Sequence, residues 1–263
     1  MADDAGDSIA LARPARRVVS LVPATTELLF AIGAGPQVVG RTAWCDYPTA
    51  AAAVPNLGDG INPNLEAIVA AAPDLVVLYN SAQNARVAAR LRELGVPAVR
   101  LSTDRLSDVP RVAAILGRLT GHTREADSLA GALDTGLAAA TVAPGPDPPD
   151  VLLLVWEQPP MTIGRGSFLS ELVERAGGRN LFGDVAASAG TVSIEAIAVR
   201  DPDLILTTAD GPSAFLDRAE WRTVPAVRAR RLLKVTGSEF SRPGPRTPLA
   251  IRELAALLRE RPQ

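Results

Sequence analysis

This 263-residue sequence contains very few of the residues with the most versatile chemistry. It has one cysteine, Cys45, one histidine, His122, and 4% aromatic residues. A single cysteine excludes an intramolecular disulfide, and a single histidine makes an imidazole-based metal site or a Ser–His–Asp triad difficult to build. We therefore expect no metal site and no catalytic centre. Cys45 is interpreted as a bystander and His122 as a surface residue.

An excess of charge and long apolar runs are also missing. Lys and Arg number 27 against 29 Asp and Glu, a formal net charge of −2, so there is no basic face for nucleic acid or for a membrane surface. No apolar run approaches the ~20 residues of a transmembrane helix. The segment 1–17 lacks the apolar region of a secretion signal.

Strand and helix signals alternate along the rest of the chain, which predicts parallel sheets covered by helices. For the first helix, Thr25 and Thr26 offer N-cap hydroxyls. The predicted strands are Arg17–Val22, Val38–Thr42, Leu75–Tyr79, Ala98–Leu101, Val151–Val155, Leu204–Thr208 and Leu232–Val235. The predicted helices are Thr26–Ile32, Asn64–Ala71, Val87–Leu94, the long stretch Val109–Ala140, Leu169–Ala176 and Pro248–Arg259.

One segment of the chain is repeated. Residues 65–78 read LEAIVAAAPDLVVL and residues 194–207 read IEAIAVRDPDLILT. An offset of 129 residues separates Glu66 from Glu195 and also Pro73 from Pro202. A repeat of this length predicts two related lobes rather than a short-period solenoid.

The length of the chain, 263 residues, and the repeat together predict an α/β protein of two Rossmann-like lobes with parallel sheets. We assign an N-terminal lobe to residues 1–104, a helical connector to 105–143 and a C-terminal lobe to 144–263. A ligand crevice is expected between the lobes, at the carboxyl ends of the strands.

The scarce aromatic residues are placed unevenly. Six fall near the carboxyl ends of predicted strands, and a charged pair flanks the last of them. These residues are Trp44, Tyr47, Tyr79, Trp156, Phe168 and Phe240, with Glu239 and Arg242. Partial burial explains any one such ring, but the set favours a site for a flat apolar ligand, because rigid rings offer large contact areas at low entropic cost.

Glu66 and Glu195 stand at the starts of the two equivalent helices. A carboxylate at a helix N-terminus contributes roughly 0.3–1 kcal/mol, which explains each glutamate alone. Their identical register in both lobes is better explained by a two-fold symmetric partner that meets both carboxylates.

Motifs from about residue 16 to the C-terminus give the sequence a family resemblance. They include 17–28 (RVVSLVPATTEL), 46–48 (DYP), 62–68 (NPNLEAI), 73–75 (PDL), 164–166 (GRG) and 177–180 (GGRN). In this order they resemble the periplasmic cobalamin-binding proteins of ABC importers. These belong to the wider siderophore- and haem-binding group, whose lobes are joined by one long helix.

The resemblance implies a non-catalytic monomer that carries a corrinoid, cobalamin or cobinamide, to a transmembrane permease dimer and holds no other cofactor. It implies that Glu66 and Glu195 dock onto permease arginines. Carried over by position, the ligand contacts are Tyr47, Tyr79, Trp156, Phe168, Phe240 and Arg242, and Trp44 and Glu239 are added to the ligand-binding set as their neighbours. It also implies a periplasmic or other extracytoplasmic location, soluble or lipid-anchored, and a signal peptide that the sequence lacks.

Other ligands and classes remain open at this stage. Residues 57–60 (LGDG) and 79–80 (YN) lack the tryptophans that some cobalamin binders carry there. Haem remains an alternative because Tyr47 or Tyr79 offers an axial phenolate, whereas a siderophore would need several arginines besides Arg242, such as Arg165 or Arg41. A ligand sensor and a two-lobed transferase are further alternatives, and the repeated glutamate and the missing phosphate cradle disfavour the transferase.

Overall fold

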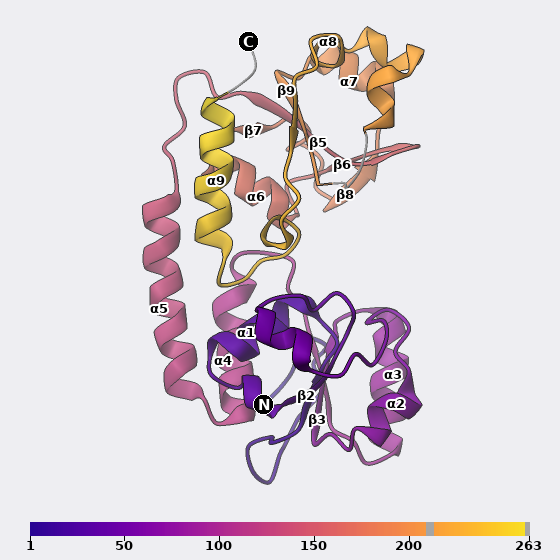
Figure 1. Ribbon diagram of the computed structural model, residues 1–263, viewed down its shortest axis with the longest axis vertical. Helices are drawn as coiled ribbons and strands as arrows, with labels where there is room; N and C mark the ends of the chain where they lie inside the picture. The colour runs from indigo at the N-terminus through magenta and orange to yellow at the C-terminus, as the bar shows by residue number, and fades with distance from the viewer. Residues whose placement is uncertain (209–212, 261–263) are drawn as a thin grey trace. The chain divides into compact units, whose positions relative to one another are not determined.

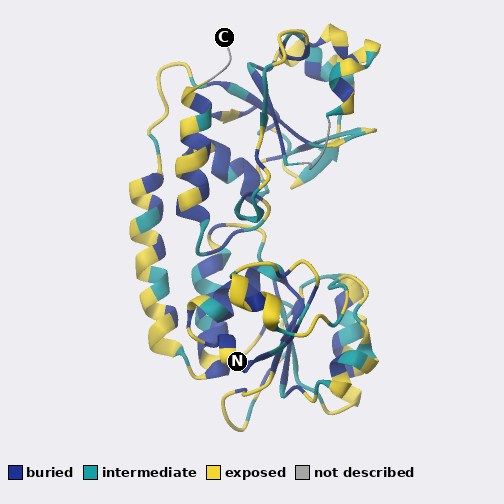
Figure 2. Ribbon diagram, viewed as in Figure 1, coloured by how far each residue is buried: buried dark blue, intermediate teal, exposed yellow. Residues whose placement is uncertain are grey.

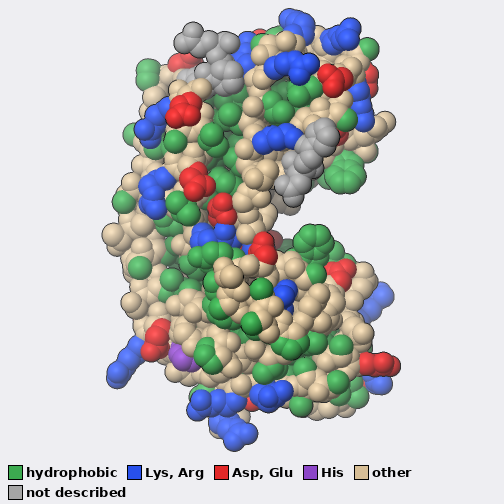
Figure 3. Space-filling model, viewed as in Figure 1, with side chains coloured by type: hydrophobic (Ala, Val, Ile, Leu, Met, Phe, Trp, Pro, Cys, Tyr) green, Lys and Arg blue, Asp and Glu red, His purple; other side chains and the backbone are tan. Residues whose placement is uncertain are grey.

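The computed structural model describes residues 1–208 and 213–260 of the chain (Figure 1). Its contacts divide the chain into two compact units. Unit 1 comprises Met1–Thr103 and Ser107–Asp134, and unit 2 comprises Asp104–Leu106 and Thr135–Gln263. None of the described helices is long and apolar enough to cross a membrane. Charged side chains of both signs are interspersed on the face seen in Figure 3.

Unit 1 is built on a four-stranded parallel sheet in the order β2-β1-β3-β4. The strands are β1 (Val18–Ser20), β2 (Val38–Arg41), β3 (Leu75–Tyr79) and β4 (Ala98–Leu101). Val18 pairs with both Val38 and Leu75. β1 and β3 stay in register, whereas the pairing of β1 with β2 shifts by one residue after Val18. The first four residues of β3 are buried, which is typical of a parallel strand covered on both faces (Figure 2).

The helices of unit 1 lie on both faces of this sheet (Figure 1). On one side are α1 (Pro23–Ala31) and α4 (Asp108–Thr120), and on the other are α2 (Leu65–Ala70) and α3 (Ala82–Glu93). α3 begins five residues earlier than predicted, because the Ser81 hydroxyl caps it by accepting a hydrogen bond from the Asn84 amide at 3.2 Å.

The prediction that Thr25 and Thr26 cap the first helix is wrong. α1 begins at Pro23, whose fixed φ suits the first helical position, and it has no side-chain cap. Both threonines are buried inside the helix and donate their hydroxyl hydrogens to the Val22 carbonyl oxygen, at 2.9 and 3.2 Å.

The long helical stretch predicted over Val109–Ala140 is two helices, α4 and α5 (Thr123–Ala140). Gly121 ends α4 in the left-handed conformation, with φ +84°, which glycine adopts at little cost. The division between the two units falls inside α5, between Asp134 and Thr135.

Unit 2 contains a six-stranded sheet in the order β10-β9-β5-β6-β8, with β7 also paired to β5. The strands are β5 (Asp150–Glu157), β6 (Pro160–Ile163), β7 (Arg179–Asn180), β8 (Ala189–Thr191), β9 (Leu204–Thr207) and β10 (Leu232–Lys234). The predicted parallel arrangement holds for β5, β9 and β10, and β7, which was not predicted, also pairs parallel to β5. β6 and β8 are antiparallel additions. A tight turn at Gln158 and Pro159 folds β6 directly back onto β5, and β8 then pairs antiparallel with β6.

Helices and an aromatic core complete unit 2. Its helices are α6 (Phe168–Arg175), α7 (Ile194–Arg200), α8 (Pro225–Arg228) and α9 (Thr247–Arg259). The Phe215 and Trp221 rings are fully buried with their centroids 4.9 Å apart, and Phe182 packs in the same cluster. These three rings therefore belong to the core of unit 2.

The sequence repeat is also a structural repeat at its helix starts. The Asn64 side chain caps α2 by accepting from the Ala67 amide at 3.1 Å, and the Ser193 side chain caps α7 by accepting from the Ala196 amide at 3.1 Å. Both caps lie two residues before a repeated glutamate, so Glu66 and Glu195 occupy the same position in the first turn of each helix.

The Pro-Asp-Leu part of the repeat joins two neighbouring strands in each unit. The Asp74 backbone amide donates to the Arg17 carbonyl at 2.9 Å, and the Arg17 amide donates to an Asp74 carboxylate oxygen at 2.9 Å. In unit 2, Asp203 and Asp150 form the same reciprocal pair, at 2.9 and 2.8 Å. The repeated aspartate therefore aligns β1 with β3 and β5 with β9.

Candidate ligand-binding site

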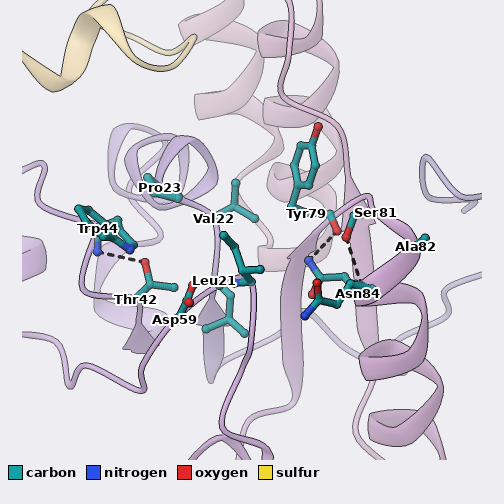
Figure 4. A pocket seen from close by; sticks show the side chains of 13 residues that line it. Leu21, Val22, Pro23, Thr42, Trp44, Asp59, Tyr79, Ser81, Ala82 and Asn84 are labelled. Carbon is teal, nitrogen blue, oxygen red and sulfur yellow. Dashed lines mark hydrogen bonds between the residues drawn. The ribbon is translucent and has the colours of Figure 1, made fainter. Parts of the chain in front are cut away.

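A cavity of about 610 Å³ lies at the carboxyl-terminal edge of the unit 1 sheet (Figure 4). Leu21 and Val22, which follow β1, line it together with Thr42, which follows β2, and Tyr79, which ends β3. Because β1, β2 and β3 are parallel, their carboxyl ends meet at this edge, where open α/β sheets bind ligands.

Two of the aromatic residues selected from the sequence, Trp44 and Tyr79, line this cavity. Trp44 is 70% exposed and Tyr79 is 36% exposed. Two large rings exposed at one cavity are more informative than single exposed apolar residues. The structure thus brings these two together, whereas Tyr47 is exposed and outside the lining of this cavity. Their contact with a ligand stays a prediction.

A buried cluster of polar side chains packs against the loop that contains Trp44. The Cys45 thiol lies 3.1 Å from the Thr26 hydroxyl and 3.2 Å from the Thr42 hydroxyl, and the Trp44 amide donates to the Thr42 hydroxyl at 3.3 Å. Cys45 is fully buried, so it holds the loop and is not presented as a nucleophile. This agrees with its interpretation as a bystander.

A second loop, which contains Asp59 and Gly60, forms another wall of the cavity. The Gly60 backbone approaches the Leu21 carbonyl so closely that a Cβ atom would collide with it. The Asp59 Oδ1 atom accepts a hydrogen bond from the Ile61 amide at 2.8 Å, which fixes the turn. Figure 4 shows the Asp59 side chain between Thr42 and Leu21.

Asn84 forms part of the cavity wall from the first turn of α3. Its side chain is 2% exposed, and its Nδ2 donates to the Tyr79 carbonyl at 3.0 Å. Its Oδ1 is buried and has no hydrogen-bond partner among the residues the structure describes. Sequence reasoning missed both Asp59 and Asn84; the Asn-Ser-x-x-Asn run after Tyr79 was the available signal for the second.

In unit 2, Trp156 and Phe168 differ in their exposure. Trp156, near the end of β5, is 61% exposed, and its indole N–H donates to the Gln158 carbonyl at 2.9 Å, so the ring has a fixed orientation. Phe168 begins α6 and is buried. Of these two rings, Trp156 lies at the surface of unit 2 and Phe168 does not.

Glu239, Phe240 and Arg242 follow β10 in a short loop. The Glu239 carboxylate forms an ion pair with Arg246, whose guanidinium also donates to the Ser238 hydroxyl at 2.9 Å. Phe240 is buried and Arg242 is half-buried. Glu239 therefore stabilises this loop, whatever further contact it makes.

Glu66 and Glu195 are both exposed in the first turns of α2 and α7. Hydrogen bonds from the backbone amide of Glu195 itself and from the Ser193 side chain lower the pKa of the Glu195 carboxyl. His122 is half-buried and lies 4.0 Å from Glu125. Within residues 1–208 and 213–260, no group of three His, Cys, Asp or Glu side chains is arranged to hold a metal ion.

Comparisons with known proteins relate the chain to periplasmic binding proteins. Residues 18–237 match a family described as periplasmic binding protein. The chain is 30% identical to the vitamin B12-binding protein of Pectobacterium atrosepticum over 93% of this chain and 89% of that one. It is 29% identical to an uncharacterized ABC transporter substrate-binding lipoprotein of Bacillus subtilis, over 96% of this chain and 83% of that one.

A solved structure shows the same fold. The periplasmic haem-binding protein RhuT from Roseiflexus sp. RS-1, in its apo form, superimposes with a TM-score of 0.81 at 25% sequence identity. The alignment covers 93% of this chain and 98% of that one.

Proposed function

This chain belongs to the periplasmic binding protein family, and on that premise we propose that it binds a corrinoid and delivers it to the permease of an ABC importer. The observation that carries the corrinoid is the unit 1 cavity, where Trp44 and Tyr79 present exposed rings at the carboxyl ends of parallel strands. The name of the Pectobacterium relative supports the same ligand.

We propose that residues of both units contact the ligand. Trp44 and Tyr79 supply apolar area from unit 1, and Tyr47 lies exposed in the same loop as Trp44. Unit 2 contributes the exposed ring of Trp156. The further contacts carried over from the sequence are Phe168, Glu239, Phe240 and Arg242. Nanomolar affinity corresponds to about −12 kcal/mol, which burial of a macrocycle against such rings can supply.

We propose that Glu66 and Glu195 dock onto basic residues of the permease. They are exposed, share one register and stand on helices with equivalent caps. Exposed ion pairs contribute only about 0.2–1 kcal/mol each, so these glutamates set the orientation and rate of encounter more than the standing affinity. Delivery to a permease places the protein outside the cytoplasm, either soluble or lipid-anchored, as a carrier without a catalytic step.

Haem is the second candidate ligand. The fold is shared with a haem-binding protein, and Tyr79 places a phenol group at the cavity, where it can serve as an axial oxygen ligand to iron. A corrinoid needs no such protein ligand to be held by its ring faces, so the two candidates differ in how they would use Tyr79.

Isothermal titration calorimetry with cyanocobalamin, dicyanocobinamide and haemin tests this function. We expect tight one-to-one binding of the corrinoids. Trp44→Ala should weaken it by roughly 10- to 100-fold, because a ring is lost from the contact. Leu94→Ala removes an exposed side chain of the same unit outside the cavity and should leave the dissociation constant of the corrinoid unchanged. If haemin alone binds, haem replaces the corrinoid as the proposed ligand. If none of the three ligands binds, both proposed ligands are wrong.

A further inference from the structure

The charge that lines the unit 1 cavity bears on which polar edge of a macrocyclic ligand it can accept. Asp59 is the one charged side chain among the described residues that line it. Arg41, which the sequence offered as a crevice arginine, ends β2 but does not line the cavity. Its guanidinium donates instead to three backbone carbonyls, those of Val54, Thr42 and Ala52, at 2.9–3.2 Å.

The polar atoms of this wall include two hydrogen-bond acceptors. Asp59 uses Oδ1 in its own turn, and its Oδ2 has no hydrogen bond to the residues the structure describes. The Asn84 amide cannot simply rotate to offer its NH₂ group, because Nδ2 is already committed to the Tyr79 carbonyl. Its Oδ1 is left as a buried acceptor with no donor among the residues that the structure describes, a state that costs roughly 1–3 kcal/mol.

From these two acceptors, and from a lining whose one charge is negative, we infer that the cavity selects ligands by the chemistry of their edges. It takes an uncharged edge that carries N–H donors, such as carboxamides, and rejects an edge of carboxylates. Asp59 is the specificity-determining residue, since it repels a carboxylate and accepts from an amide. This inference rests on the proposed function but concerns the edge of the ligand and not the ring.

The experiment compares two ligands that share one corrin ring and differ in the charge of its edge. Dicyanocobinamide carries amides around the ring, one of them extended by an aminopropanol, and dicyanocobyrinic acid carries carboxylates at the same positions. We expect the wild-type protein to bind the carboxamide form at least tenfold more tightly. Asp59→Asn keeps an acceptor for the Ile61 amide and removes the charge. It should narrow the preference by roughly three- to tenfold, chiefly by tightening the binding of the acid.

Two controls separate repulsion from a change of shape. Asp127→Asn removes an exposed carboxylate of α5, outside the cavity, and should leave the preference unchanged. Raising the salt concentration should tighten the binding of the acid to the wild-type protein, since screening weakens repulsion between like charges, and should have a smaller effect on Asp59→Asn.

The outcome for edge selection is distinct from the outcome for the proposed ligand. If corrinoids fail to bind and haemin binds, the corrinoid is wrong, and the same inference predicts that haemin dimethyl ester binds more tightly than haemin. Equal binding of the amide and acid forms, or a preference that Asp59→Asn leaves untouched, would overturn the inference while the carrier function stands.

Discussion

The two units share one half of their architecture and differ in the other. The shared half is the helix–strand pair α2–β3 in unit 1 and α7–β9 in unit 2, with equivalent caps and the same reciprocal aspartate–backbone pair. The residue before the repeated proline adopts φ +45° in both units, at Ala72 and at Asp201. Each of these features is local, so a repeat in sequence is sufficient to reproduce it.

The units differ in how the next strand is reached. In unit 1 the chain crosses from β1 through α1 to a parallel β2, which brings a third carboxyl end to the edge with the cavity. In unit 2 the chain turns back from β5 into an antiparallel β6. Unit 2 thus ends β5 at a hairpin that carries the exposed Trp156.

This comparison separates the two tasks of the molecule. The proposed docking glutamates stand on the shared half, where a partner with two equivalent sites requires equivalence. The proposed ligand residues stand outside the shared half, except for Tyr79, which ends β3. Apart from Tyr79, changes to the shared half should therefore affect transport or stability, and changes outside it at the proposed ligand residues should affect ligand affinity.

The largest effect is expected from removing both docking carboxylates. Glu66→Ala combined with Glu195→Ala should abolish uptake in a reconstituted importer and leave the ligand dissociation constant unchanged, because both side chains are exposed and outside the unit 1 cavity. Calorimetry and vesicle uptake measure the two quantities. The exposed pair Glu125→Ala and Glu220→Ala is the matched control. A loss of ligand affinity in the docking variant would contradict the separation of tasks.

A smaller effect is expected from the repeated aspartates, measured as the free energy of unfolding in urea. Asp74 accepts from two backbone amides, those of Arg16 and Arg17, whereas Asp203 accepts from that of Asp150. Asp74→Ala should cost about 2–3 kcal/mol and Asp203→Ala about 1–2 kcal/mol.

The conservative variant Asp74→Asn retains an acceptor oxygen and should lose less than Asp74→Ala. Amide hydrogen exchange at Arg17 and Asp150 then reports each unit separately. For the Asp74 variants, exchange should become faster at Arg17 and stay unchanged at Asp150. Equal losses for Asp74→Ala and Asp203→Ala would show that the second amide contributes nothing.

Much of the fold was readable from the sequence because its signals are local. The parallel strands are aliphatic runs, and the repeat of Glu-Ala-Ile and Pro-Asp-Leu encodes caps and strand pairing within a few residues. The β5–β6 hairpin was missed because Gln158 and Pro159 interrupt the run without a glycine-based turn signal. The break in the connector was missed because Gly121 was one of several glycines in a helical pattern.

The candidate site was predictable only in part. Trp44 and Tyr79 stood out because large rings are scarce and these two follow strands. Asp59 and Asn84 carry no such signal, since their meeting at one cavity depends on how the loop after β2 packs against the residue that follows β1 and on where α3 begins. Such contacts depend on tertiary packing, which composition and spacing do not specify.

The smallest expected effect tests the shared backbone turn itself. Ala72 and Asp201 both hold φ +45°, which is unfavourable for a residue with a Cβ and is better tolerated by aspartate than by alanine. Ala72→Gly should therefore raise the free energy of unfolding by about 0.5–1 kcal/mol, and Asp201→Gly by less. Ala70→Gly, two residues earlier at the last position of α2, should lower it by up to about 1 kcal/mol. If Ala72→Gly instead lowered the free energy of unfolding, as Ala70→Gly is expected to do, the turn at Ala72 would not be strained as its φ indicates. The turns at Ala72 and Asp201 would then share a backbone conformation without sharing its energetic cost.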